Sequence, residues 1–214
     1  MLRDPARFPL LALVCACVTV LAAATGCSTL GGTDTPAGPA FANVTPSSLV
    51  IGALPGDVPE PLGAAVEQGL FDAHGVDVTF VELATPAERD AALAARSVDA
   101  VIGDIASGSA LEASGAQITL AAVVDDGATV DPAVGSRVLI VADEYIALPA
   151  GMLAVRAVLR AWDDALASMP PESHTYPLAA PPAAAVVDPV LASLVADGVI
   201  PDAIRYADLV LDLR

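Results

Sequence analysis

Short apolar runs and helix patterns alternate along the chain from Leu49 to Val124, and this alternation limits the possible folds more than any other feature. Consecutive parallel strands need a long crossover connection, usually a helix, so strand–helix repeats are typical of a mainly parallel sheet. The pattern predicts an α/β fold, a three-layer sandwich with helices on both faces of the sheet. The expected strands are 49–54, 76–83, 98–102 and 117–124.

Three helices are expected between these strands, each with its own start or stop signal. The first covers residues 59–71 and is followed by Gly75, which suits a left-handed stop. The second opens with the capping box Thr85-Pro86-Ala87-Glu88 and runs to about residue 96. The third is capped by Asp104 and runs to residue 114.

Beyond Asp125 the pattern changes to a polar link, a further strand, two helices and a proline-rich segment. Arg156, Arg160 and Asp164 lie four residues apart on the longer helix, and we interpret them as a solvated face with ordinary ion pairs. The expected ranges are 126–135 for the link, 136–142 for the strand, 149–167 for the longer helix, 169–182 for the proline-rich segment and 188–198 for the last helix, which starts at Asp188-Pro189.

The first 27 residues have a basic start, an apolar core and small residues before Cys27, which is typical of a secretory signal. The run Ala24-Thr25-Gly26-Cys27 resembles a bacterial lipobox. That resemblance implies cleavage after Gly26 and acylation of Cys27 with diacylglycerol and palmitate. An uncleaved membrane anchor, or an ordinary signal with an incidental cysteine, is the alternative. The expected organisation is a signal peptide (1–26), a flexible tether (27–47) and one lobe (48–214), in which 48–125 form a βαβ core and 136–214 a return strand with C-terminal helices.

Composition excludes several functions. The formal net charge is −17 and all nine basic residues are arginine, which argues against a nucleic-acid partner and removes lysine chemistry. The three cysteines lie within the first 27 residues, so the body has no disulfide framework. His74 and His174 are the only histidines, and neither has a catalytic or ligating group at a useful spacing. We therefore expect no enzyme activity, no cofactor and no metal.

Two loops at the carboxyl ends of strands, 55–61 and 103–107, are candidates for binding, because ligands of open α/β sheets bind at that edge. Each loop leads into a helix, and free amide donors at a helix start suit an anion or a polar group. Simple turn chemistry with N-caps explains the same residues equally well.

The order of motifs from Leu49 to Val124 resembles the first lobe of ABC-transporter substrate-binding proteins of the nitrate/sulfonate/taurine type, a family that includes thiamine-precursor binders. The chain end DGVIPDAIRYADLV resembles the tail of aliphatic-sulfonate binders. The motifs that carry the resemblance are Gly52 to Pro55, Pro61-Leu62, Gly69-Leu70-Phe71, Gly75-Val76-Asp77-Val78, Val98-Asp99-Ala100, Gly103 and Ala110-Leu111.

The resemblance implies a lobe of the type 2 periplasmic-binding-protein-like fold that captures a small solute and passes it to an ABC permease and ATPase complex. The family has a whole second lobe where this chain has only residues 125–135. Four outcomes are open: weak binding in an open groove, a cover formed by the proline-rich segment, a site completed by a partner protein, or loss of solute capture.

The resemblance carries ten binding residues onto this chain. Several are acids and neither loop contains arginine, which favours an amine or heteroaromatic cation over a sulfonate or nitrate. The expected function is that of a lipid-anchored solute-binding component on the outer face of the cell membrane, and the alternative is a non-transporting envelope interaction protein. The ten residues are Leu54, Pro55, Asp57, Pro59, Glu60, Gly103, Asp104, Ile105, Ser107 and Asp125.

Overall fold

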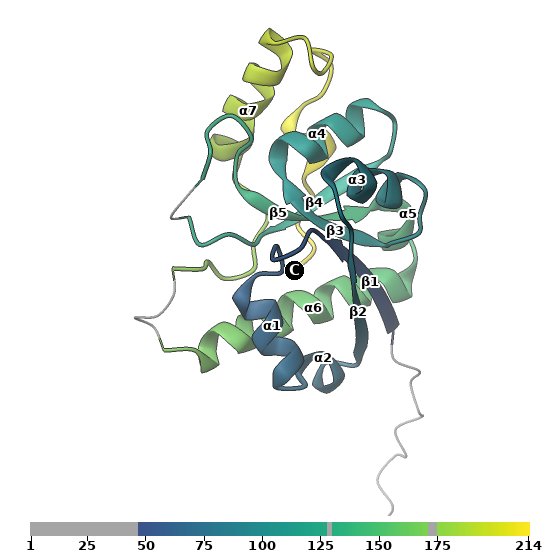
Figure 1. Ribbon diagram of the computed structural model, residues 1–214, viewed down its shortest axis with the longest axis vertical. Coiled ribbons are helices and arrows are strands. Elements are labelled where there is room, and N and C mark those ends of the chain that lie inside the picture. Colours follow the sequence, from purple (N-terminus) through teal and green to yellow (C-terminus); the bar gives the residue numbers. More distant parts are fainter. Residues whose placement is uncertain (1–46, 128–129, 171–174) are drawn as a thin grey trace, which may run out of the picture. The chain divides into compact units, whose positions relative to one another are not determined.

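In the part of the chain that the structure describes, five strands form one sheet in the order β2–β1–β3–β5–β4 (Figure 1). The computed structural model describes residues 47–127, 130–170 and 175–214. β1 pairs in parallel with β2 and β3, whereas β5 is antiparallel to β3 and β4. The strand bounds are β1 Ser47–Ala53, β2 Val76–Glu82, β3 Ala100–Asp104, β4 Ile118–Val123 and β5 Arg137–Ala142.

Four strands therefore point the same way, as expected, but the sheet is mixed because β5 lies between β3 and β4. Its position has a physical reason. The described residues of the link from β4 to β5 form no crossover helix, and an antiparallel return needs none. The first residue of β5, Arg137, consequently pairs with Asp104 at the last position of β3.

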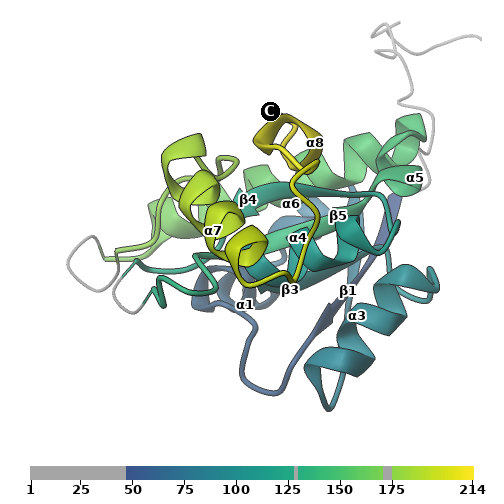
Figure 2. The ribbon, with the colours of Figure 1, turned by 90° about the horizontal axis from the view of Figure 1, so that it is seen from above.

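Helices cover both faces of the sheet, which confirms the three-layer sandwich. α1, α2 and α6 lie on one face and α3, α4 and α7 on the other (Figure 1). Seen from above, Figure 2 shows α4, α7 and α8 in front of the sheet and α6 behind it. The helix bounds are α1 Glu60–Glu67, α2 Leu70–Ala73, α3 Pro86–Ala94, α4 Ile105–Ala113, α5 Asp143–Ile146, α6 Pro149–Ser168, α7 Ala184–Ala196 and α8 Tyr206–Leu209.

Two apolar clusters, one on each face, hold the layers together. Successive side chains of a strand point to opposite faces, so β1 sends Leu49 and Ile51 into the cluster around α6 and Val50 toward the other cluster. Trp162 of α6 is almost completely buried in the first cluster. Burial on both faces explains why the strands read as nearly continuous apolar runs.

Two helix predictions were wrong in detail, and two short helices were not predicted. The single helix expected over 59–71 is divided into α1 and α2, because Gly69 adopts a left-handed conformation with φ of 65°. α7 begins at Ala184 rather than at Asp188-Pro189, and Pro189 lies inside it. Burial of Val187 in the core explains the earlier start. α5 and α8 were not predicted, since single turns show no periodicity.

The described part of the proline-rich segment follows the free edge of β4 and the end of α6. Val123 donates a backbone hydrogen bond to the carbonyl of Ala180 (2.9 Å), and the Trp162 indole donates to the carbonyl of Pro177 (2.9 Å). Tyr176 packs edge-on against Trp162, with ring centroids 5.7 Å apart. This segment is therefore fixed against the sheet rather than projecting from it.

The expected signal peptide (1–26), Cys27 and all of the tether except Ser47 lie outside the described residues, as does His174. β1 begins at Ser47, one residue before the expected start of the lobe. None of the described helices combines the length and the apolar character needed to cross a membrane.

Candidate ligand-binding site

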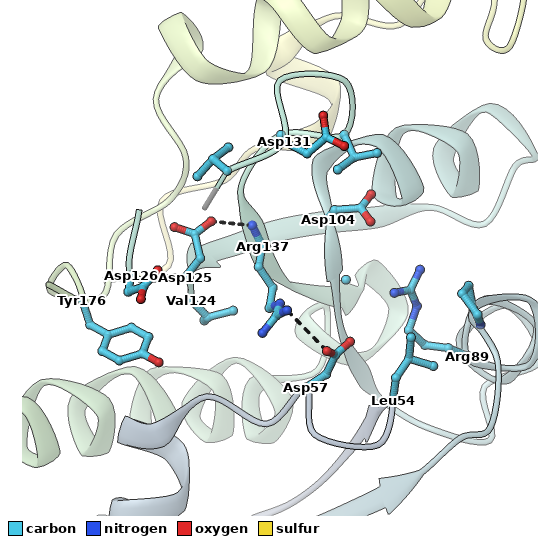
Figure 3. A pocket seen from close by; sticks show the side chains of 15 residues that line it. Leu54, Asp57, Arg89, Asp104, Val124, Asp125, Asp126, Asp131, Arg137 and Tyr176 are labelled. Atoms are coloured by element: carbon cyan, nitrogen blue, oxygen red, sulfur yellow. Dashed lines mark hydrogen bonds and ion pairs between the residues drawn. The ribbon is translucent and has the colours of Figure 1, made fainter. Parts of the chain in front are cut away.

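A cavity of about 400 Å³ lies at the edge of the sheet where β1, β3 and β4 end (Figure 3). Because β5 runs in the opposite direction, its first residue reaches the same edge. The link between β4 and β5, together with the proline-rich segment, supplies the remaining wall. The lining residues are Leu54, Asp57, Pro86, Arg89, Gly103, Asp104, Val124, Asp125, Asp126, Val130, Asp131, Val134, Gly135, Arg137 and Tyr176.

Charged side chains dominate this lining. Five aspartates and two arginines line it, so the formal charge of the lining residues is 2 − 5 = −3. Tyr176 supplies an aromatic ring beside them (Figure 3). The aspartates are Asp57, Asp104, Asp125, Asp126 and Asp131, and the arginines are Arg89 and Arg137.

Arg137 joins three of the converging segments. Its Nη2 lies 3.3 Å from Oδ1 of Asp57, which follows β1. Its backbone N–H donates to Oδ2 of Asp125 (2.6 Å), and Oδ1 of Asp125 accepts from the N–H of Gly127 (3.0 Å). Asp125 therefore holds the β4–β5 link in place, and its two oxygens are both occupied.

Arg89 is buried under the cavity, with only 4% of its surface exposed. Its Nε and Nη2 both lie 2.8 Å from Oδ1 of Asp90. A β-carbon on Gly103 would lie 3.4 Å from Cζ of Arg89 and 2.9 Å from Oγ of Ser107. The absent side chain at Gly103 leaves room chiefly for the Ser107 hydroxyl and for Cδ1 of Ile140, which a β-carbon would approach to 2.8 Å, whereas the distance to the guanidinium is an ordinary contact.

Asp104 is the N-cap of α4, and the first amides of this helix are already occupied. Ser107 N–H donates to Oδ1 of Asp104 (2.7 Å), and Asp104 N–H donates to Oγ of Ser107 (3.1 Å). The N–H groups of Ile105 and Ala106 donate to the carbonyls of Ser136 and Val134. The expected free donors for an anion are therefore absent here, and the N-cap interpretation of Asp104 is confirmed.

The loop after β1 forms a tight turn in which Gly56 has a φ of 79° and Asp57 N–H donates to the carbonyl of Leu54 (3.0 Å). The turn places Leu54 and Asp57 at the cavity. Pro55 and Glu60 are exposed outside the lining, and Pro59 is buried as the N-cap of α1.

The ten residues predicted from the sequence divide evenly. Leu54, Asp57, Gly103, Asp104 and Asp125 line the cavity, whereas Pro55, Pro59, Glu60, Ile105 and Ser107 do not. Ile105 is fully buried in the core, and Ser107 completes the α4 cap.

The sequence reasoning missed both arginines, and with them Asp126, Asp131 and Tyr176. No arginine occurs in the two loops, but α3 and β5 bring one each from outside them. An antiparallel placement of the strand 136–142 would have located Arg137 at this edge. No local sequence pattern identified Arg89, Asp126, Asp131 or Tyr176 as residues of the site.

The histidine that the structure describes takes no part in this site. Nε2 of His74, at the end of α2, lies 2.8 Å from Oδ2 of Asp164 on α6. Within residues 47–127, 130–170 and 175–214, no group of histidine, cysteine and acidic residues is arranged to hold a metal ion.

No family model matches the sequence, and no curated protein matches it. Solved structures do. A protein from Bordetella bronchiseptica RB50 is 13% identical with a TM-score of 0.55, over 78% of this chain and 95% of that one. The alkanesulfonate-binding protein SsuA from Xanthomonas axonopodis pv. citri, solved with bound MOPS, is 14% identical with a TM-score of 0.51, over 79% of this chain and 99% of that one.

A Candida albicans protein described as having the generic periplasmic binding protein fold is 22% identical, but the match covers only 36% of this chain and 26% of that one. Its TM-score of 0.31 is too low to support an argument. The likeness to the alkanesulfonate-binding protein shows the fold: the chain has the α/β fold of a solute-binding protein.

Proposed function

We propose that this protein binds a small solute outside the cytoplasm for an ABC uptake transporter and that a lipid on Cys27 anchors it to the membrane. The observation that carries the proposal is the cavity at the carboxyl edge of the sheet, where charged groups from α3, β3, β5 and two loops converge. Polar groups that converge in a cavity at this edge are typical of ligand sites in α/β proteins. The fold shared with an alkanesulfonate-binding protein supports the same role.

The proline-rich segment forms part of the cavity wall, as a second lobe would. It contributes Tyr176 to the cavity wall, and Trp162 holds it there through the carbonyl of Pro177. Thr175 donates a hydrogen bond to the carbonyl of Asp126 and so ties the segment to the β4–β5 link. Of the four outcomes left open by the sequence, a site covered by this segment fits these contacts best.

The charge of the lining favours a cation. Arg137 is paired with Asp57 and Arg89 with Asp90, so both positive charges are already neutralised by partners. An anion would meet an excess of carboxylates and no free amides at the start of α4. A cation would meet Asp104 and Asp131, and the lining also contains the aromatic ring of Tyr176, the kind of group that makes cation–π contacts. The ligand class that we propose is an amine or a heteroaromatic cation.

A ligand screen tests this proposal. In thermal-shift and calorimetric titrations of the purified protein, amines and thiamine-like cations should raise the melting temperature, because a ligand that binds only the folded state stabilises it. Alkanesulfonates and nitrate should have little effect. A higher rank for the sulfonates would contradict the ligand class.

The Asp104→Asn variant should bind the best cation more weakly, while Asp77→Asn should not. Asp77 is an exposed carboxylate on β2, outside the lining of the cavity, so it controls for the loss of one negative charge. If no compound binds and a membrane pull-down recovers a protein partner, the envelope interaction role replaces the solute-binding role.

A further inference from the structure

A second cavity, of about 200 Å³, lies between α6 and the C-terminal tail. It is lined by Arg156, Leu159, Arg160, Asp163 and Arg214, and it shares no lining residue with the first cavity. Three of the seven arginines in the described residues line it, in a chain whose formal net charge is −17. The side chains that line it carry a formal charge of 3 − 1 = +2.

Two of these arginines lack an acidic partner. Among the described residues, five arginines form ion pairs, and the two that do not are Arg156 and Arg160. Both line this cavity. They lie four residues apart on one helix, where like charges repel each other, so their positions work against the stability of α6.

The two acids at helical spacing from Arg160 pair with other groups, Asp163 with Arg214 in the same cavity and Asp164 with His74 outside it. Asp163 and Asp164 follow it at the spacings that allow helical ion pairs. Oδ2 of Asp163 lies 2.8 Å from Nη2 of Arg214, and its Oδ1 accepts from the N–H of Ala179 (2.7 Å). Oδ2 of Asp164 lies 2.8 Å from Nε2 of His74.

Arg156 is held in position by the tail. Its Nε donates to the carbonyl of Leu213 (2.7 Å), and the terminal nitrogens of the guanidinium make no hydrogen bond within the described part of the chain. Leu159, only 5% exposed, gives the cavity an apolar floor.

We propose that this cavity is a binding site for a phosphate-type oxyanion. Guanidinium groups present planar pairs of donors that match phosphate oxygens in a bidentate manner, and a dianion would relieve the repulsion between Arg156 and Arg160. The oxyanion is either free phosphate or the headgroup of an anionic phospholipid, since the chemistry recognised is the same. This site does not depend on the function proposed for the first cavity.

A calorimetric titration with inorganic phosphate tests the free anion. Arg160→Gln should weaken binding about tenfold, equivalent to about 1.4 kcal/mol. Arg160 is exposed and makes no hydrogen bond or ion pair with the described residues, so the variant should fold normally, and relief of the repulsion with Arg156 should leave its melting temperature equal to or slightly above that of the wild type. Arg205→Gln removes a charge elsewhere, near α8, and should leave phosphate binding unchanged. Asp163→Asn should act in the opposite direction and tighten binding.

Vesicle co-sedimentation tests the headgroup. The full chain carrying Cys27→Ser, which cannot be acylated at that position, is mixed with phosphatidylglycerol or phosphatidylcholine vesicles. Preference for phosphatidylglycerol that Arg160→Gln abolishes and Arg205→Gln retains supports a headgroup ligand. Phosphate binding with the same dependence and without vesicle preference supports a free anion. If Arg160→Gln changes neither measurement, the site does not exist.

Discussion

Asp104 combines a structural and a proposed binding role, and two substitutions separate them. Its carboxylate accepts the Ser107 N–H that caps α4, and it also lines the acidic cavity. Asp104→Ala removes both functions. Asp104→Asn keeps an oxygen acceptor for the cap and removes only the charge, because asparagine and aspartate are about equally good N-caps.

The expected magnitudes follow from these contacts. Loss of the cap in Asp104→Ala should lower the free energy of unfolding by about 1 kcal/mol. For a chain of this size that corresponds to a melting temperature roughly 2–4 °C lower. Asp104→Asn should stay within about 0.5 kcal/mol of the wild type. Both variants should bind the best cation at least about tenfold more weakly, since both lose a charge-assisted contact.

Thermal unfolding followed by circular dichroism measures the first effect, and calorimetric titration measures the second. If the alanine and asparagine variants are equally destabilised, the capping argument is wrong. If the asparagine variant binds the cation as tightly as the wild type, Asp104 does not contribute charge to the site. A nearly unchanged melting temperature together with weaker binding is the combination expected for asparagine.

Two further predictions concern packing and titration. Gly63→Ala should stabilise α1 by about 1 kcal/mol, because the new β-carbon meets nothing within 4 Å. Gly151→Ala should destabilise the protein by about 2 kcal/mol, because its β-carbon would lie 2.0 Å from the carbonyl oxygen of Tyr145. Urea unfolding measures both, and midpoints of the two variants that move in the same direction would contradict this argument. Burial, with a smaller effect of the Asp99 charge, raises the pKa of Tyr145 to about 12. The contribution of the neutral Tyr145 side chain to the free energy of unfolding should therefore be complete below a pH of about 10 and disappear as the pH rises through about 12. Ultraviolet titration of Tyr145→Phe should lack the highest component, and an unchanged curve would refute the assignment.

Much of the fold could be predicted because local signals mark its elements. Thr85 caps α3 through the N–H of Glu88, and Asp104 caps α4, both as the sequence predicts. Gly75 has the expected left-handed conformation, with φ of 74°. The order of strands in the sheet could not be predicted, because hydrophobic runs indicate burial and do not specify which neighbour a strand pairs with. The place of β5 followed only from the structure.

The site, like the fold, could be predicted only where local sequence patterns mark its residues. Leu54, Asp57 and Asp104 could be located because they follow strands whose carboxyl ends share one edge. Arg137 and Tyr176 come from segments that only the tertiary fold brings there. The preference for a cation was inferred from loops without arginine, and it now rests on a different basis, the ion pairs that occupy Arg89 and Arg137.

The position of β5 also sets the order in which the chain can fold as it is made. β4 has β5 as its sheet neighbour, and α6, which covers the face of β1, follows β5 in the sequence. A growing chain that ends before residue 137 can pair β1, β2 and β3, but it leaves β4 without its partner and the face that carries α1 and α2 without α6. Stable structure should therefore form only once the α6 segment is available, and until then the β4 strand and part of the apolar face stay exposed.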